Sequence, residues 1–134
     1  MNDIDQNRAV VARLYEGFAT GDMPMILSIL EPGIIWTEAE GFPYAGTYEG
    51  ADAVVAGVFV RLATEWEGYQ AIPERYVAEG DTVVALGHYS GRYLQTKKRF
   101  RAPFVHVWTV SAGKLVRFVQ HTDTAVVQSA LDPA

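Results

Sequence analysis

The chain has 134 residues, of which 49% are hydrophobic, with 11 Lys and Arg against 16 Asp and Glu, a net charge of −5 and no Cys. We expect one domain, residues 1–134, without a cationic nucleic-acid surface, and the lack of Cys excludes disulfides and thiolate nucleophiles. The first residues lack the basic and apolar regions typical of a signal peptide, and no apolar run approaches the roughly 18 residues of a membrane span. We therefore expect a cytoplasmic protein with neither nucleic acid nor membrane as a partner.

The first half of the chain predicts helices. Apolar residues recur at helical spacing over residues 5–19, and Asp22 with Pro24 starts a second short helix. Residues 34–38 have the β-branched and aromatic content of a strand. Residues 40–50 hold three Gly together with two Tyr and a Phe, which predicts a loop folded over apolar surface, and residues 51–66 predict a third helix.

The second half predicts a meander of strands. Residues 69–78, 82–93, 99–110 and 114–120 are the strand candidates, because turn residues separate them. Pro73 suits an edge position, since proline cannot donate to a central ladder. A short helix over residues 124–131 follows. Three helices, a long antiparallel sheet and a capping helix make an α+β domain.

Five sequence blocks occur in order over nearly the whole chain. They are LYEGF followed by GD (residues 14–22), IIW (34–36), YAGTYEG (44–50), HVWTV (106–110) and GKLVRF (113–118). Together they resemble the SnoaL-like, ketosteroid-isomerase-related branch of the nuclear transport factor 2-like superfamily. The resemblance implies a cone-shaped barrel, in which a strongly bent antiparallel sheet wraps the helices around a central pocket. That superfamily contains isomerases, cyclases, dehydratases and binding proteins, so the residues inside the cone must carry the functional argument.

Strand alternation predicts which side chains share the inner face of the sheet. Ala85 and Gly87 are small, so their face should leave room for a cavity. The outer face holds more apolar residues than a solvent-exposed face usually does, and the resemblance implies that this face pairs with a second copy in a homodimer. The predicted inner residues are Ile34, Trp36, Glu38, Val83, Ala85, Gly87, Tyr89, Ala102, Phe104, His106, Trp108, Val110, Val116, Phe118 and Gln120, and the outer ones are Val84, Leu86, His88, Val105, Val107 and Thr109.

Two ionisable residues are the catalytic candidates. Glu38 follows Trp36 and precedes the aromatic loop, so burial should raise its pKa and suit it to proton transfer near neutral pH. The resemblance adds that isomerases carry their general-base aspartate at this position. His106 lies between Phe104 and Trp108, and its position matches the second acid of the isomerase oxyanion site and the pocket histidine of the cyclases. Glu38 as a solvated strand end and His106 as a satisfied core histidine are the structural alternatives.

The sequence also departs from both kinds of enzyme. The catalytic aspartate of the cyclases corresponds to Gln120, which cannot act as a base. The tyrosine donor of the isomerases corresponds to Leu14, with Tyr15 about 100° further round the helix. We expect these nine residues to bind a substrate: Tyr15, Trp36, Phe42, Phe59, Tyr89, Phe104, Trp108, Phe118 and Gln120.

The pattern leads to a first functional hypothesis and two alternatives. The first is a cofactor-independent isomerase, lyase or cyclase that transfers a proton on a small apolar carbonyl compound, with Glu38 moving the proton and His106 binding the oxyanion. The alternatives are a non-catalytic protein that binds a small apolar or aromatic molecule, and a structural domain with a filled core. No metal is expected, because His88, His106 and His121 lack metal-binding spacing.

Overall fold

A computed structural model describes residues 3–134. Its helices and strands follow the predicted order, with one additional short strand and one π-helical turn. The elements are α1 (Asp3–Thr20), α2 (Met23–Ile29), β1 (Leu30–Glu38), β2 (Gly46–Glu49), α3 (Ala51–Val54), the π-helical turn η1 (Val55–Phe59), α4 (Val60–Glu65), β3 (Trp66–Glu79), β4 (Thr82–Tyr93), β5 (Arg99–Ser111), β6 (Lys114–Thr122) and α5 (Thr124–Leu131).

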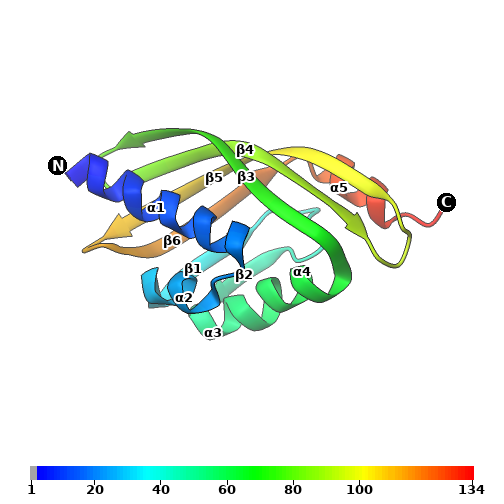
Figure 1. Cartoon of the computed structure of the whole chain (residues 1–134), viewed down its shortest axis with the longest axis horizontal. Coiled ribbons are helices and arrows are strands. Elements are labelled where there is room, and N and C mark those ends of the chain that lie inside the picture. Colours follow the sequence, from blue (N-terminus) through cyan, green and yellow to red (C-terminus); the bar gives the residue numbers. More distant parts are fainter. Residues whose placement is uncertain (1–2) are drawn as a thin grey trace.

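The strands form one six-stranded sheet in the order β2-β1-β6-β5-β4-β3. Its long strands arch over α1 and over the α3–α4 segment (Figure 1). The predicted α+β class is confirmed, with two corrections to the predicted antiparallel barrel: the sheet is open, and β1 pairs with β6 in parallel. Alternation along a strand reveals its two faces but not the direction of its neighbour. Here β1 and β6 start at the same end of the sheet, with Leu30 opposite Leu115.

The N-terminal helices bury most of the predicted apolar stripes, and α2 begins where its predicted cap indicates. The Asp22 carboxylate accepts a hydrogen bond from the Met25 backbone N–H at 3.2 Å, which satisfies a free donor of the first turn of α2. The predicted third helix is interrupted by η1, where Gly57 lies so close to Tyr48 that a Cβ would be 2.3 Å from its ring. The extra residue of this turn leaves the adjacent Val58 and Phe59 both buried.

Two register details correct the predicted inner face. The β5–β6 register shifts between Thr109 and Val110, so Leu115 is buried and Val116 is only half-buried, contrary to the prediction. The space above Gly87 is filled, because a Cβ there would lie 2.1 Å from the carbonyl oxygen of Ile72 and 2.7 Å from the Phe104 ring. Simple alternation fails at both places because the pairing is irregular.

The predicted outer face of the sheet is half-buried in the single chain at all six positions. His88 on this face lies 3.1 Å from the Glu74 carboxylate. Pairing of the face with a second copy stays a prediction. Within residues 3–134 no helix is long and apolar enough to cross a membrane.

Candidate active site

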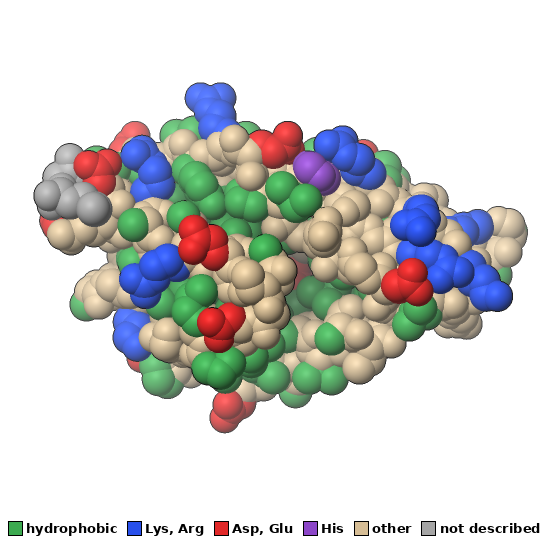
Figure 2. All heavy atoms as spheres, viewed as in Figure 1, with side chains coloured by type: hydrophobic (Ala, Val, Ile, Leu, Met, Phe, Trp, Pro, Cys, Tyr) green, Lys and Arg blue, Asp and Glu red, His purple; other side chains and the backbone are tan. Residues whose placement is uncertain are grey.

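A cavity of about 480 Å³ lies between the inner face of the sheet and the segment that runs from η1 through α4. Figure 2 shows a hollow near the middle of one face of the molecule. Among the described residues, Glu38 is the only acidic group in the cavity lining, and no Lys or Arg contributes to it. Nine lining residues are aromatic: Phe18, Trp36, Phe42, Phe59, Trp66, Tyr69, Tyr89, Trp108 and Phe118.

Glu38, the last residue of β1, supplies a buried carboxyl group to this aromatic wall. Its side chain is 5% exposed. The Trp36 indole N–H donates to Oε1 at 3.2 Å, whereas Oε2 is buried without a hydrogen-bond partner among the described residues. Burial raises the pKa of Glu38 to about 8, and the Trp36 hydrogen bond offsets only part of that effect. The carboxyl group can therefore gain or lose a proton near neutral pH.

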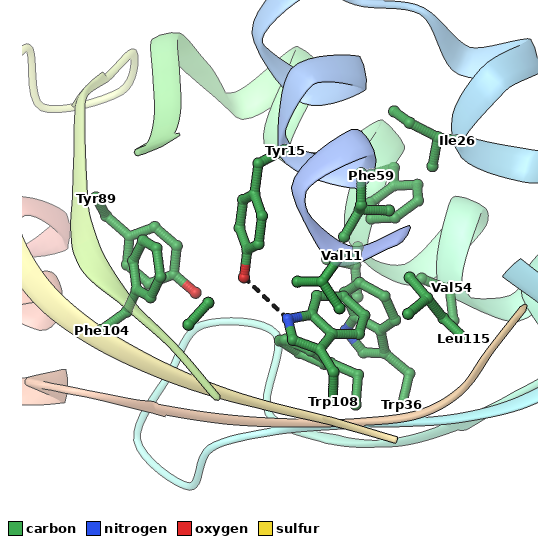
Figure 3. Packing of buried hydrophobic residues seen from close by; sticks show 14 of the residues in the cluster. Val11, Tyr15, Ile26, Trp36, Val54, Phe59, Tyr89, Phe104, Trp108 and Leu115 are labelled. Carbon is green, nitrogen blue, oxygen red and sulfur yellow. Dashed lines mark hydrogen bonds between the residues drawn. The ribbon is translucent and has the colours of Figure 1, made fainter. Parts of the chain in front are cut away.

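His106 on β5 lies between two tyrosine hydroxyl groups. Its Nδ1 is 2.5 Å from the Tyr15 hydroxyl, and its Nε2 is hydrogen-bonded to the Tyr89 hydroxyl. The indole N–H of Trp108 donates to the Tyr15 oxygen at 3.0 Å (Figure 3). Burial, and next the charge of His121, hold the pKa of His106 well below its ordinary value, so the imidazole is neutral. Both of its nitrogens are thus already engaged within the protein.

Gln120 links this group of side chains to the end of β1. Its Oε1 accepts the backbone N–H of Ala39 at 2.9 Å, and its Nε2 donates to the Tyr89 hydroxyl at 2.9 Å. Because Ala39 directly follows Glu38, the same amide positions Tyr89 and the strand end that carries the carboxyl group. Gln120 cannot replace the cyclase aspartate, and in this structure it orients its neighbours.

The structure brings most of the sequence-predicted site residues to one cavity. Both catalytic candidates line it, together with seven of the nine binding candidates: Trp36, Phe42, Phe59, Tyr89, Trp108, Phe118 and Gln120. Tyr15 and Phe104 are not in the lining. They lie behind His106, where the Phe104 ring stacks on the imidazole at 3.9 Å between centroids. Their contribution to the site is support for His106.

Tyr69 is a lining residue that the sequence analysis missed. It makes no side-chain hydrogen bond to the described residues, and its ring packs 5.5 Å from that of Tyr89. Burial, followed by the charge of Glu38, raises the pKa of Tyr69, so the hydroxyl and the carboxyl group interact. The β3–β4 register is irregular between Glu67 and Gln70, so alternation along the strand gave no usable signal for this position.

The aromatic loop closes one side of the cavity, as its composition predicts. Phe42 lines the cavity and is 3% exposed. Tyr44 anchors the loop: its hydroxyl donates to the Glu65 carboxylate at 2.7 Å and accepts the Trp66 indole N–H at 2.9 Å. The Arg61 guanidinium lies 4.2 Å from the centre of the Tyr44 ring. The end of α4 therefore fixes the loop that carries Phe42.

Replacing Tyr44 with phenylalanine should loosen this loop. The change removes two hydrogen bonds and leaves the Trp66 indole without its acceptor, so we expect a loss of about 1–3 kcal/mol in the free energy of unfolding. Urea denaturation measures the loss, and hydrogen exchange should show faster exchange at residues 39–45. Tyr93→Phe is a suitable control, because no hydrogen bond of the Tyr93 hydroxyl is present among the described residues. Equal exchange in both variants would contradict the anchoring role.

Comparison with known proteins assigns the family. A model of the SnoaL-like domain matches residues 11–118. The chain belongs to the SnoaL-like family. This confirms the resemblance drawn from the sequence blocks. Among residues 3–134 of this SnoaL-like chain, no group of three or more His, Asp or Glu could hold a metal ion.

Solved structures share the fold over almost the full length of this SnoaL-like chain. An NTF2-like protein from Burkholderia thailandensis E264 is 43% identical with a TM-score of 0.91, covering 95% of this chain and 98% of that one. An NTF2-like protein of unknown function from Burkholderia pseudomallei K96243 is 29% identical with a TM-score of 0.85, over 93% and 96%. TerC, co-crystallized with polyporic acid, is 26% identical with a TM-score of 0.85, over 94% and 98%. No curated protein matches the chain.

Proposed function

We propose that this protein catalyses proton transfer on a neutral, hydrophobic carbonyl compound, in a reaction of the isomerase, lyase or cyclase type. Glu38 takes the proton from a carbon next to the carbonyl group, the C–H electron pair moves into the enolate, and the proton returns to the same or another carbon. The observation that carries this proposal is the buried Oε2 of Glu38, which has no partner among the described residues in an aromatic cavity.

The charge of the cavity favours a neutral substrate. No cationic side chain among the described residues lines it, so a carboxylate or phosphate group of a ligand would have no counter-charge there. The aromatic wall would exclude water from the bound compound, and burial keeps the Glu38 carboxylate a stronger base than a solvated one. TerC, whose structure resembles this one, was co-crystallized with polyporic acid, which supports an organic ligand for this fold.

The oxygen of the substrate needs a hydrogen-bond donor as charge develops on it. The sequence pattern predicts this role for His106, but tyrosine hydroxyl groups occupy both of its ring nitrogens. Two hydroxyl groups belong to residues of the cavity lining, those of Tyr69 and Tyr89. We therefore move the role of oxyanion donor from the imidazole to a tyrosine.

Deuterium exchange tests the proposed reaction without knowledge of the natural substrate. A panel of hydrophobic ketones, including 1-tetralone, is incubated with the protein in D₂O, and mass spectrometry follows deuterium uptake next to the carbonyl group. The protein-dependent rate should rise about tenfold per pH unit below pH 8 and then level off, because only the ionised Glu38 accepts a proton. Binding of a ketone without any exchange would contradict the proposal and favour the non-catalytic binding protein.

A further inference from the structure

Two hydrogen bonds around His106 have donors whose identity is certain. They limit where the protons of Tyr15, His106 and Tyr89 can lie. The Trp108 indole can only donate, so the Tyr15 oxygen accepts from it. The Gln120 amide is oriented by the Ala39 N–H, so its nitrogen donates to the Tyr89 oxygen. The neutral His106 ring carries one proton, which resides on either Nδ1 or Nε2.

The two tautomers of His106 leave different hydroxyl protons without an acceptor. With the proton on Nε2, Tyr15 donates to Nδ1, and the Tyr89 oxygen accepts from both His106 and Gln120. The proton of Tyr89 then has no partner among the described residues, and Tyr89 lines the cavity. With the proton on Nδ1, the Tyr15 oxygen accepts two hydrogen bonds, and its own proton has no partner at a buried position outside the cavity lining.

The first arrangement is the more stable one. An unpaired donor that faces a cavity can bind water or a ligand, whereas an unpaired donor in the packed core loses its hydrogen bond outright. That difference corresponds to a population ratio of roughly five- to a hundredfold. Figure 3 shows the Tyr15 hydroxyl directed at Trp108, with the Tyr89 and Phe104 rings on the opposite side of Tyr15.

We propose that Trp108, Tyr15 and His106 form a one-way chain of hydrogen bonds that holds the Tyr89 hydroxyl as a donor in the cavity, where it binds a carbonyl oxygen. Tyr89 is then a catalytic residue that contacts the substrate, and Tyr15 and His106 are positioning residues that do not. The inference rests on the proposed function for what the donor does. Substrate oxygens that accept hydrogen bonds are selected, and hydrocarbons of the same shape are not.

Two measurements that need no turnover test the chain. Nitrogen-15 NMR of the imidazole rings should show His106 protonated at Nε2 and not at Nδ1, with His88→Gln and His121→Gln used for assignment. Calorimetry compares 1-tetralone with tetralin, the analogue that lacks the oxygen. Tyr89→Phe should lower the ratio of the two affinities by about three- to tenfold, the value of one neutral hydrogen bond.

Tyr15→Phe separates positioning from simple packing. Without the Tyr15 hydroxyl, Nδ1 has no partner in either tautomer, so each tautomer leaves one buried group unpaired and the preference for a proton on Nε2 is reduced. We expect the nitrogen-15 signals to shift toward a mixture of the two tautomers, and the affinity ratio to fall toward that of Tyr89→Phe. Tyr76→Phe is the matched control, because its ring lies 6.2 Å from that of Tyr15 without belonging to the chain.

Specific outcomes overturn the inference. An Nδ1-protonated or doubly protonated His106 in the unaltered protein at pH 7 would do so, and so would an unchanged affinity ratio in folded Tyr15→Phe. Should Tyr15→Phe not fold, the tautomer of the unaltered protein and the ratio in Tyr89→Phe still decide the matter. Glu38→Gln should keep the Nε2 tautomer of His106, so a failure of the exchange reaction is distinguishable from a failure of the chain.

Discussion

Glu38→Gln is expected to reduce protein-dependent deuterium exchange by at least about a hundredfold, because the amide cannot accept the proton that the carboxylate removes. The same change should stabilise the folded protein in alkaline solution. Glutamine has nearly the same shape as glutamic acid, but it never has to carry a charge beside Trp36 in the buried wall. Function and stability therefore make opposite demands on this position.

The stability effect of Glu38 depends on pH with a definite sign. The pKa of Glu38 is about 8 in the folded protein against an ordinary value near 4.5. Between these two pH values the folded state binds more protons than the unfolded state. The contribution of Glu38 to the free energy of unfolding therefore falls as pH rises. Above pH 8 the loss in the free energy of unfolding reaches up to about 5 kcal/mol, because each unit of pKa difference corresponds to roughly 1.4 kcal/mol. Glu38→Gln removes this dependence.

Urea denaturation of the unaltered protein and Glu38→Gln at pH 5 and pH 9 measures the difference. The advantage of the variant should be much larger at pH 9 than at pH 5. Glu40→Gln is the control, because Glu40 is exposed in the adjoining loop and its replacement should change neither stability nor exchange. Parallel pH dependences for all three proteins would show that Glu38 ionises freely and would remove the basis of the proposed reaction.

Gly87→Ala is expected to cause the largest loss of stability of any methyl addition considered for this chain. A Cβ at this position would lie 2.1 Å from the Ile72 carbonyl oxygen and 2.7 Å from the Phe104 ring. The backbone of β3 would have to move, because a backbone oxygen has no alternative rotamer. Overpacking of this kind costs about 1–3 kcal/mol, and a backbone collision belongs at or above the upper end of that range.

The site should respond as well, because Phe104 stacks on His106. Thermal denaturation gives the stability change, and the nitrogen-15 signals of His106 report its displacement. Gly33→Ala is the control, since a Cβ there would meet only the movable end of the Glu31 side chain, at 3.1 Å. Similar melting temperatures for Gly87→Ala and Gly33→Ala would disprove the close approach of β3 and β4.

Sequence periodicity identified the elements and the main site residues because each depends on local pattern. The alternation through Trp36 and Glu38, and through His106 and Trp108, placed all four on the inner face, and all four line the cavity. The composition of residues 40–50 indicated a loop over apolar surface, and Phe42 lies there. Local pattern was sufficient wherever the strands pair regularly.

Residue alternation mispredicted buried positions where backbone pairing is irregular or where contacts join distant segments. The register shift in β6 exchanged Leu115 for Val116, and the irregular start of β3 concealed Tyr69. The space expected above Gly87 is occupied by Ile72, which belongs to the next strand. None of these features follows from the spacing of apolar residues within one segment.

The sequence by itself determined the class of the fold, the family and an inner face with one carboxyl and one imidazole group. Only the tertiary structure decided what these groups do. It buried Glu38 with one oxygen unpaired and engaged both nitrogens of His106 with Tyr15 and Tyr89. The physical reason is that the direction of a hydrogen bond depends on which donors meet which acceptors across the core. Tyr15 and His106 are 91 residues apart in the chain, so no local pattern could reveal their contact.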